Sequence, residues 1–344
     1  MTSAKRLVHI DGLRGLAVLL MVMVHAAATW NPSTASSTSM LAMIVSGLGG
    51  LAAPLFVALL GWGLYQRKLT FRQRLVRSGF LVVCQAAVNL VAPHLFDPFT
   101  PGVLSLMALV ILSEPIWSFP LRQAWRTPLE RFLLIAAAVL AFTLFASSWQ
   151  GPSSWSSRIH VASVGIFVSH LLLTGTYPLI PWVLFAAFGM TVASTTNEER
   201  HHLFLLLGGA GLTASVLGLA YALHQDRTWA LPTGDALLTF FPANTMFLVA
   251  ALTGVILLWT LAETRWSMKQ LQMVGQCSLS VYVTHFIPFV HLHTLDQQYN
   301  WSLETATLVV MVYTLVWAVL GTLWRKRASN LTLEFMMRRF EKIS

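Results

Sequence analysis

Arg14 and His25 are two ionisable residues on the first apolar segment of the chain. They are eleven positions apart, which in an α-helix is about 16 Å along the axis and within about 20° of the same face. Entry into the membrane from the side of Lys5 and Arg6 places Arg14 near the surface. His25 then lies near the bilayer midplane, where an ionisable residue is by default a sign of function. A cation near the surface and a titratable base at mid-depth predict a ligand that reaches inward.

Two further ionisable residues are expected at membrane depth. His285 follows the expected start of its span, near Gly275, by about ten residues or roughly 15 Å, which matches the depth of His25. Glu114 precedes Arg122 by eight residues, and this spacing puts it about 12 Å from the same surface. His25, His285 and Glu114 are therefore the candidate catalytic residues.

Structural roles for these side chains remain open from the sequence alone. Glu114 and His285 could form interhelical hydrogen bonds that hold the spans together. Arg14 could extend its guanidinium to the headgroups, or pair with Asp11 three positions earlier on the same helix. The alignment of Arg14 with His25 on one helix face favours ligand binding.

The composition predicts an all-α, polytopic integral membrane protein. Of 344 residues, 56% are hydrophobic and only 10% are charged, and the mean hydropathy is +0.67. We expect one transmembrane domain over residues 1–344, with 324–344 as a cytoplasmic tail. Apolar stretches of about 17 to 25 residues predict about ten spans, near 13–30, 41–65, 78–96, 102–121, 131–148, 178–194, 203–223, 243–262, 271–292 and 304–323.

The stretch 161–174 is also apolar, but it cannot join the following stretch in a single crossing. Gly175, Pro178 and Pro181 interrupt the helix between them. We therefore expect 161–174 to be an interfacial or re-entrant piece.

The basic residues predict the orientation. Of 22 Lys and Arg residues, all but Arg158 and Arg227 fall on one side of this arrangement, and that side is expected to be cytoplasmic. Both termini are then cytoplasmic, in a plasma or inner membrane. The net charge of +9 reflects this topology and contact with anionic lipid headgroups. It does not indicate nucleic-acid binding, which would need a basic soluble face.

No metal site or disulfide is expected. Cys84 and Cys277 lie in separate spans without CxxC spacing, and the pair His291 and His293 has no apparent third ligand. The outer loops 31–40, 150–160 and 224–242 are polar and nearly uncharged. Their tryptophans suit either sugar recognition or ordinary anchoring at the membrane interface.

Four motifs in order along the chain resemble those of known transmembrane acyltransferases. Residues 9–17, together with His25 eleven residues beyond Arg14, are similar to the first span of the acyltransferase-3 family and of the heparan-α-glucosaminide N-acetyltransferase-like group. The stretches 47–63, 175–182 and 275–285 resemble later motifs of these groups. Residues 58–60 are Ala-Leu-Leu, where the acyltransferase-3 pattern usually has a Ser before the Gly. This departure favours the heparan-acetyltransferase-like branch.

The resemblance implies acyl transfer across the membrane. An acyl-CoA, in the simplest case acetyl-CoA, is expected to donate from the cytoplasm to a hydroxyl or amine of a saccharide or lipid-linked glycan outside. A mid-membrane His would act as base or as acyl carrier. The site residues so implied are His25, His285 and Glu114 for catalysis, Arg14, Asp11, Arg67 and Arg72 for the donor, and Tyr177, Trp182 and Tyr282 for the acceptor.

Two other functions remain possible from the sequence. The first is a proton-coupled transporter, in which His25, Glu114 and His285 relay protons and the broken segment at Pro178 and Pro181 lines a substrate path. The second is a flippase or scaffold for envelope assembly without chemistry. The absence of a visible internal repeat weighs against the transporter. The identity of the acceptor, the choice between O- and N-acylation and the oligomeric state stay open.

Overall fold

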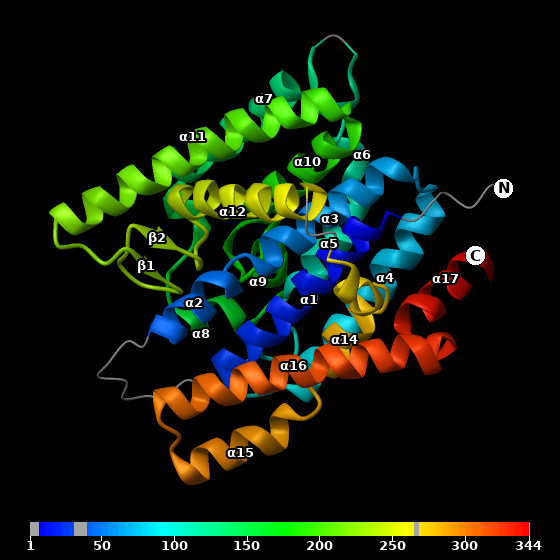
Figure 1. Ribbon diagram of the computed structural model, residues 1–344, viewed down its shortest axis with the longest axis vertical. Helices are drawn as coiled ribbons and strands as arrows, with labels where there is room; N and C mark the ends of the chain where they lie inside the picture. Colours follow the sequence, from blue (N-terminus) through cyan, green and yellow to red (C-terminus); the bar gives the residue numbers. More distant parts are fainter. Residues whose placement is uncertain (1–6, 31–39, 125, 265–267, 344) are drawn as a thin grey trace. The chain divides into compact units, whose positions relative to one another are not determined.

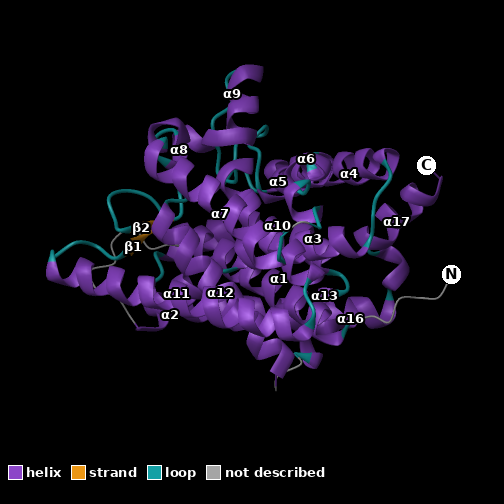
Figure 2. Cartoon of the chain, turned by 90° about the horizontal axis from the view of Figure 1, so that it is seen from above, coloured by secondary structure: helices purple, strands orange, loops and turns teal. Residues whose placement is uncertain are grey.

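The structure is a computed structural model that describes residues 7–30, 40–124, 126–264 and 268–343. Helices make up almost all of the regular structure in these ranges, and Figure 2 shows a single short strand pair among them. This confirms the all-α, multi-pass fold class. Lys5, Arg6, Arg265 and the loop 31–39, on which part of the predicted topology depends, lie outside the described residues.

The chain forms two compact units, of which unit 1 comprises residues 1–56, 87–96 and 258–344, and unit 2 comprises 57–86 and 97–257. Three helices, α3 (Ala52–Gln66), α4 (Phe71–Val91) and α12 (Thr245–Thr264), continue from one unit into the other. The remaining elements of unit 1 are α1 (Val8–Thr29), α2 (Met40–Gly49), η4 (Lys269–Leu271), α13 (Gln272–Gly275), α14 (Ser278–Thr284), α15 (Phe289–Tyr299), α16 (Leu303–Arg327), η5 (Ser329–Leu331) and α17 (Leu333–Ile343).

Unit 2 contains the middle of the chain. Its remaining elements are α5 (Val103–Leu112), α6 (Glu114–Trp117), η1 (Pro120–Arg122), α7 (Pro128–Phe145), η2 (Ser147–Gln150), α8 (Trp155–Ile159), α9 (Val164–Ser169), the π-helical turn η3 (His170–Thr174), α10 (Leu179–Ser194), α11 (Asn197–His224) and the parallel strands β1 (Ala230–Leu231) and β2 (Leu238–Thr239). Capping boxes at Thr127 with Glu130 and at Thr196 with Glu199 fix the starts of α7 and α11.

By length and composition, the described residues contain seven helices able to cross a membrane, or up to eight if the bent pair 164–174 and 179–194 forms one span. The prediction of about ten spans differs at two places. The stretch 102–121 yields only the ten-residue α5, because Pro115 cannot continue the helix ladder. The stretch 271–292 divides into α13, α14 and the start of α15, with Pro288 directly before α15.

The bent pair 164–174 and 179–194 has the interruption that the sequence predicts between these two apolar stretches. The two segments meet at 45°, as a broken span or a re-entrant loop. Gly175, Pro178 and Pro181 lie in or next to the break.

Glycines let α1 approach the 268–275 segment closely within unit 1. A side chain added at Gly12 would meet Met268 at 2.7 Å, and one at Gly15 or Gly275 would strike the backbone of Leu271 or Asp11. The two glycines of the Asp11 to Gly15 motif therefore serve helix packing. Figure 1 shows α16 running alongside α1, which completes this group of helices.

Unit 2 uses the same device between α3 and α10. A side chain at Gly61 would strike the backbone of Ala186, and one at Gly189 would strike the backbone of Ala58. This reciprocal contact brings two membrane helices to backbone distance, as small residues commonly do in lipid. It also gives Ala58 a packing role.

Candidate active site

His25 and His285 meet at the centre of unit 1. His25 lies on α1, His285 directly follows α14, and the distance between His25 Nδ1 and His285 Nε2 is 3.1 Å. The side chains are 8% and 0% exposed. Their ring planes differ by 15° and the centroids are 5.2 Å apart, so the rings lie nearly coplanar and edge to edge. The structure thus brings together two of the three predicted catalytic residues, which are 260 positions apart in the sequence.

The hydrogen bonds assign a tautomer to each ring when both are neutral. His285 Nδ1 lies 3.2 Å from the carbonyl oxygen of Val281, which can only accept, so His285 carries its proton on Nδ1. His285 Nε2 is then an acceptor, and His25 must donate to it from Nδ1. The lone pair of His25 is consequently on Nε2, the nitrogen left available as a base.

Aromatic rings enclose the imidazole pair. The ring centroids of Tyr282 and Phe286 lie 5.8 and 4.7 Å from that of His25. Tyr313 donates a hydrogen bond to the backbone carbonyl of His285, which fixes the end of α14 against α16. Tyr282, predicted to bind the acceptor, is therefore part of the wall around both histidines.

Arg14 and Asp11 belong to a polar network at one end of α1. Arg14 Nη1 lies 3.4 Å from Asp11 Oδ1, and the Asp11 carboxylate is buried. Gln276 donates from Nε2 to Asp11 Oδ2 at 3.2 Å, and Arg325 donates from Nε to Gln276 Oε1 at 2.8 Å. The i,i+3 pairing of Arg14 with Asp11 is thus present, and Asp11 holds Arg14 while Arg14 remains partly exposed.

A basic pocket opens beside this network in unit 1. It encloses about 400 Å³ and includes the Gln276 and Arg325 side chains that continue the Asp11 network. Two cationic groups at one pocket suit a ligand with phosphate groups. Sequence reasoning placed Arg325 and Lys326 only in a basic tail, because nothing in their spacing indicates the contact with Gln276. The pocket is lined by Gln272, Met273, Gln276, Arg325, Lys326 and Ser329.

A second histidine pair lies near the end of α1 that follows His25. The rings of His94 and His293 stack with centroids 4.6 Å apart. His94 Nε2 is 3.3 Å from Thr29 Oγ1, and that hydroxyl donates to the carbonyl of His25. His293 belongs to the His291 and His293 pair seen in the sequence, whereas nothing in the sequence indicates that His94, just after α4, contacts it. Within the described ranges, no group of three or more His, Cys, Asp or Glu side chains could hold a metal ion.

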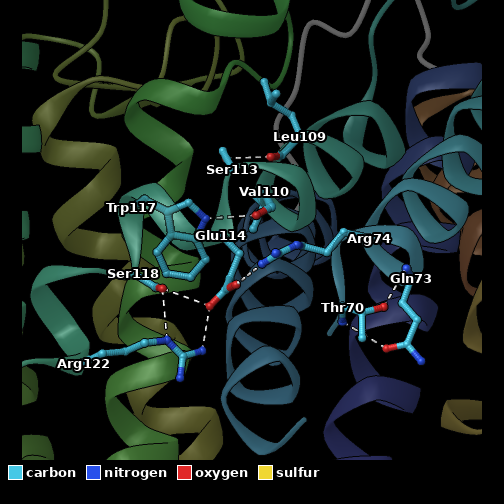
Figure 3. Close-up of polar contacts among 10 residues, drawn as sticks. All are labelled: Thr70, Gln73, Arg74, Leu109, Val110, Ser113, Glu114, Trp117, Ser118 and Arg122. Atoms are coloured by element: carbon cyan, nitrogen blue, oxygen red, sulfur yellow. Dashed lines mark hydrogen bonds and ion pairs between the residues drawn. The ribbon is translucent and has the colours of Figure 1, made fainter. Parts of the chain in front are cut away.

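Glu114 lies in unit 2, between two arginines (Figure 3). Arg122 donates to Glu114 Oε1 at 2.6 Å and Arg74 donates to Oε2 at 2.9 Å. Ser118 adds a hydrogen bond to Oε1 at 2.9 Å. Both oxygens are therefore occupied, as in the structural role that the sequence leaves open, and the catalytic role of Glu114 stays a prediction.

The other predicted donor and acceptor residues also belong to unit 2. Arg67 and Arg72 are exposed, after α3 and at the start of α4 respectively. Tyr177 and Trp182 contact each other with ring centroids 5.0 Å apart, and Phe240 packs against both. Trp182 is fully buried, so this cluster packs the break before α10.

Arg158, one of the two basic residues predicted to lie on the non-cytoplasmic side, is buried in unit 2. It is 1% exposed, and burial lowers its pKa to about 10. Its guanidinium donates to the carbonyls of Thr174 and Gly175 at 3.0 and 2.9 Å, and to that of Gln150 at 2.9 Å. Arg158 thus holds the end of the π-helical turn, where the carbonyl dipoles replace water around its charge.

The fold defines a multi-pass membrane protein with a buried, hydrogen-bonded imidazole pair. Residues 7–323 match the sequence model of the acyltransferase-3 family, which is described as an acyltransferase domain. The chain belongs to this family and is a membrane acyltransferase. Of the two groups that its motifs resemble, the match is to acyltransferase-3. No curated protein matches the chain in a sequence search.

Proposed function

We propose that this acyltransferase moves an acyl group, in the simplest case acetyl, from acyl-CoA to a hydroxyl or amine of a saccharide or lipid-linked glycan. The donor binds from the cytoplasm and the acceptor from the opposite side of a plasma or inner membrane. The observation that carries this proposal is the 3.1 Å contact between His25 Nδ1 and His285 Nε2. It leaves a base nitrogen on the same helix as the Arg14 and Asp11 network.

The chemistry follows from the tautomers. His25 Nε2 accepts the proton of the attacking hydroxyl or amine as the new bond to the thioester carbon forms. The C–S bond breaks, and the CoA sulfur leaves as a thiolate that takes the proton from His25. His285 holds His25 in the required orientation through its Nε2 acceptor. Transfer through an acyl group carried on His25 Nε2 uses the same atom.

The donor site rests on charge. Arg14, held by Asp11, and the pocket with Arg325 and Lys326 offer cations to the phosphates of CoA on unit 1. A role of Arg67 and Arg72 in donor binding stays a prediction. Arg14 precedes His25 by eleven helical positions, or about 16 Å, a distance suited to a long, thin pantetheine arm.

The test uses purified protein in nanodiscs with labelled acetyl-CoA and a mixture of candidate glycan acceptors. Wild type should transfer label to an acceptor, and His25→Ala should lower turnover by about 10² to 10⁴-fold. The matched control is His291→Ala, because His291 is an exposed histidine of the same unit and should keep wild-type turnover.

Each outcome of this test separates the functions considered. Retention of more than about a tenth of wild-type turnover in His25→Ala would exclude the base role. In proteoliposomes of the same protein, uptake of a solute without consumption of the thioester would favour the transporter. Release of label to water alone would remove the glycan acceptor from the proposal.

A further inference from the structure

Helix α17 lies beyond the part of the chain that matches the acyltransferase-3 family, which ends at residue 323. Successive residues of a helix turn by about 100°, so Glu334 and Glu341 share one face while Met336 and Phe340 share another. The basic side chains lie between these two faces. They are Arg338, Arg339 and Lys342.

The acidic face of α17 contacts the start of α14. Glu334 Oε1 accepts the backbone N–H groups of Leu279 and Ser280 at 2.6 and 3.3 Å, and Oε2 accepts the Ser280 hydroxyl at 2.7 Å. Glu341 is also buried. The carboxylate of Glu334 therefore caps the start of α14, the helix that His285 directly follows.

The basic and apolar faces of α17 are solvent-accessible. Met336 and Phe340 are 43% and 50% exposed, and Arg338, Arg339 and Lys342 are all exposed. An exposed apolar edge beside a row of cations is the pattern of a helix that lies in a membrane interface.

The position of α17 in the chain agrees with this pattern. The candidate span α16 ends in Arg325, Lys326 and Arg327, where a span meets the headgroups. The turn η5 follows with Leu331 exposed, and Figure 1 shows α17 turning away from the line of α16. The helix therefore begins at the level of the membrane surface and leaves the direction of the span.

We propose that α17 binds anionic phospholipid headgroups at the membrane surface and that Glu334 couples this contact to the order of α14. The apolar edge enters the acyl boundary, the cations contact lipid phosphates, and the acidic face stays on the start of α14. The consequence for catalysis rests on the proposed role of His285, whereas the lipid contact does not.

The lipid contact is tested on the full-length protein in nanodiscs of phosphatidylcholine with or without phosphatidylglycerol. A fluorophore is attached at Met336→Cys, since the native Cys84 and Cys277 are buried, and it is quenched by spin-labelled lipid. Quenching should rise with phosphatidylglycerol and fall with added salt. Each basic residue removed from Arg338, Arg339 and Lys342 should weaken the partition by about fivefold.

The matched control for charge is Arg338→Lys with Arg339→Lys, which should keep the phosphatidylglycerol response. Equal quenching in both lipid mixtures, or in the variant with all three cations changed to Gln, would overturn the lipid contact. Protection of the label from lipid by a second copy or by another protein would overturn it too.

The coupling is tested by hydrogen exchange at the amides of Leu279 and Ser280. Phosphatidylglycerol should slow this exchange several-fold in wild type, and Glu334→Gln should abolish the slowing while the Met336 label still reports lipid. Glu304→Gln, an exposed carboxylate at the start of α16, should behave as wild type. Lipid-independent exchange in wild type would refute the coupling, and this readout needs no acyl transfer.

Discussion

His285 and His25 have different roles because their remaining hydrogen bonds differ. His285 Nδ1 is committed to the carbonyl of Val281, so only its Nε2 can receive the His25 proton. His285→Leu removes that acceptor and should lower kcat by about 10²-fold or more, with little change in KM for the donor. His285→Gln keeps an acceptor oxygen and should retain more activity than His285→Leu.

Steady-state kinetics of the two variants check this ranking. If His285→Leu and His285→Gln were equally active, His285 would be a packing residue and not a positioning residue for His25.

His94 provides a pH test, because it lies just after α4 and outside the candidate spans. Burial, and to a smaller extent His293, lowers its pKa from 6.5 to about 4. Between these two values the unfolded chain binds a proton at His94 and the folded chain does not. The contribution of His94 to stability is therefore fully present above about pH 6.5 and is lost as the pH falls toward about 4.

The unfolding midpoint of wild type should consequently fall more than that of His94→Gln when the pH is lowered from about 7 to about 5. Thermal unfolding of both proteins in the same detergent measures the difference. An equal fall in the two proteins would contradict the assignment.

Among the helices, α1 and α13 can pack closely only because glycine lies at their contact. A side chain at Gly275 would strike the backbone of Asp11, whereas one at Gly47 on α2 would meet nothing within 4 Å. Gly275→Ala should therefore destabilise the protein by about 1 to 3 kcal/mol. Gly47→Ala should be neutral or stabilising by up to about 1 kcal/mol, since Ala is the better helix former.

Denaturant unfolding of the two variants checks this contrast. Equal stability would mean that α1 and the 268–275 segment are not in backbone contact. In that case the Asp11 and Gln276 hydrogen bond would also need another explanation.

For the whole molecule, the sequence predicts the class of fold better than it predicts which residues contact one another. Hydropathy and the spacing of Arg14 and His25 indicate a membrane span with a functional face. The depth predicted for His285 assumes a continuous span from Gly275, whereas residues 271–292 divide into α13, α14 and the start of α15, so this depth stays a prediction. The sequence does not predict that Gln276 joins Asp11 to Arg325, or that the carbonyl of Val281, four residues before His285, selects the tautomer of that histidine.

Other features could not be derived because apolar composition does not reveal where a helix breaks. Pro115 and Pro288 divide two stretches that are apolar enough to be read as spans. Arg158 looked like a loop cation, since no spacing rule predicts that backbone carbonyls from residues 150 to 175 converge on its guanidinium. Glu114 was predicted at depth, but its two arginine partners come from separate elements.

Transfer across the membrane is the central claim, and oriented proteoliposomes test it directly. The orientation is measured with an impermeant thiol reagent on two variants: Gln73→Cys, predicted on the basic side, and Ser153→Cys, predicted on the opposite side. Labelled acetyl-CoA is then supplied on one side and the acceptor on the other. Labelled acceptor should form only when the donor is on the Gln73 side and the acceptor on the Ser153 side. Acylation with donor and acceptor confined to the same side would contradict transfer across the membrane.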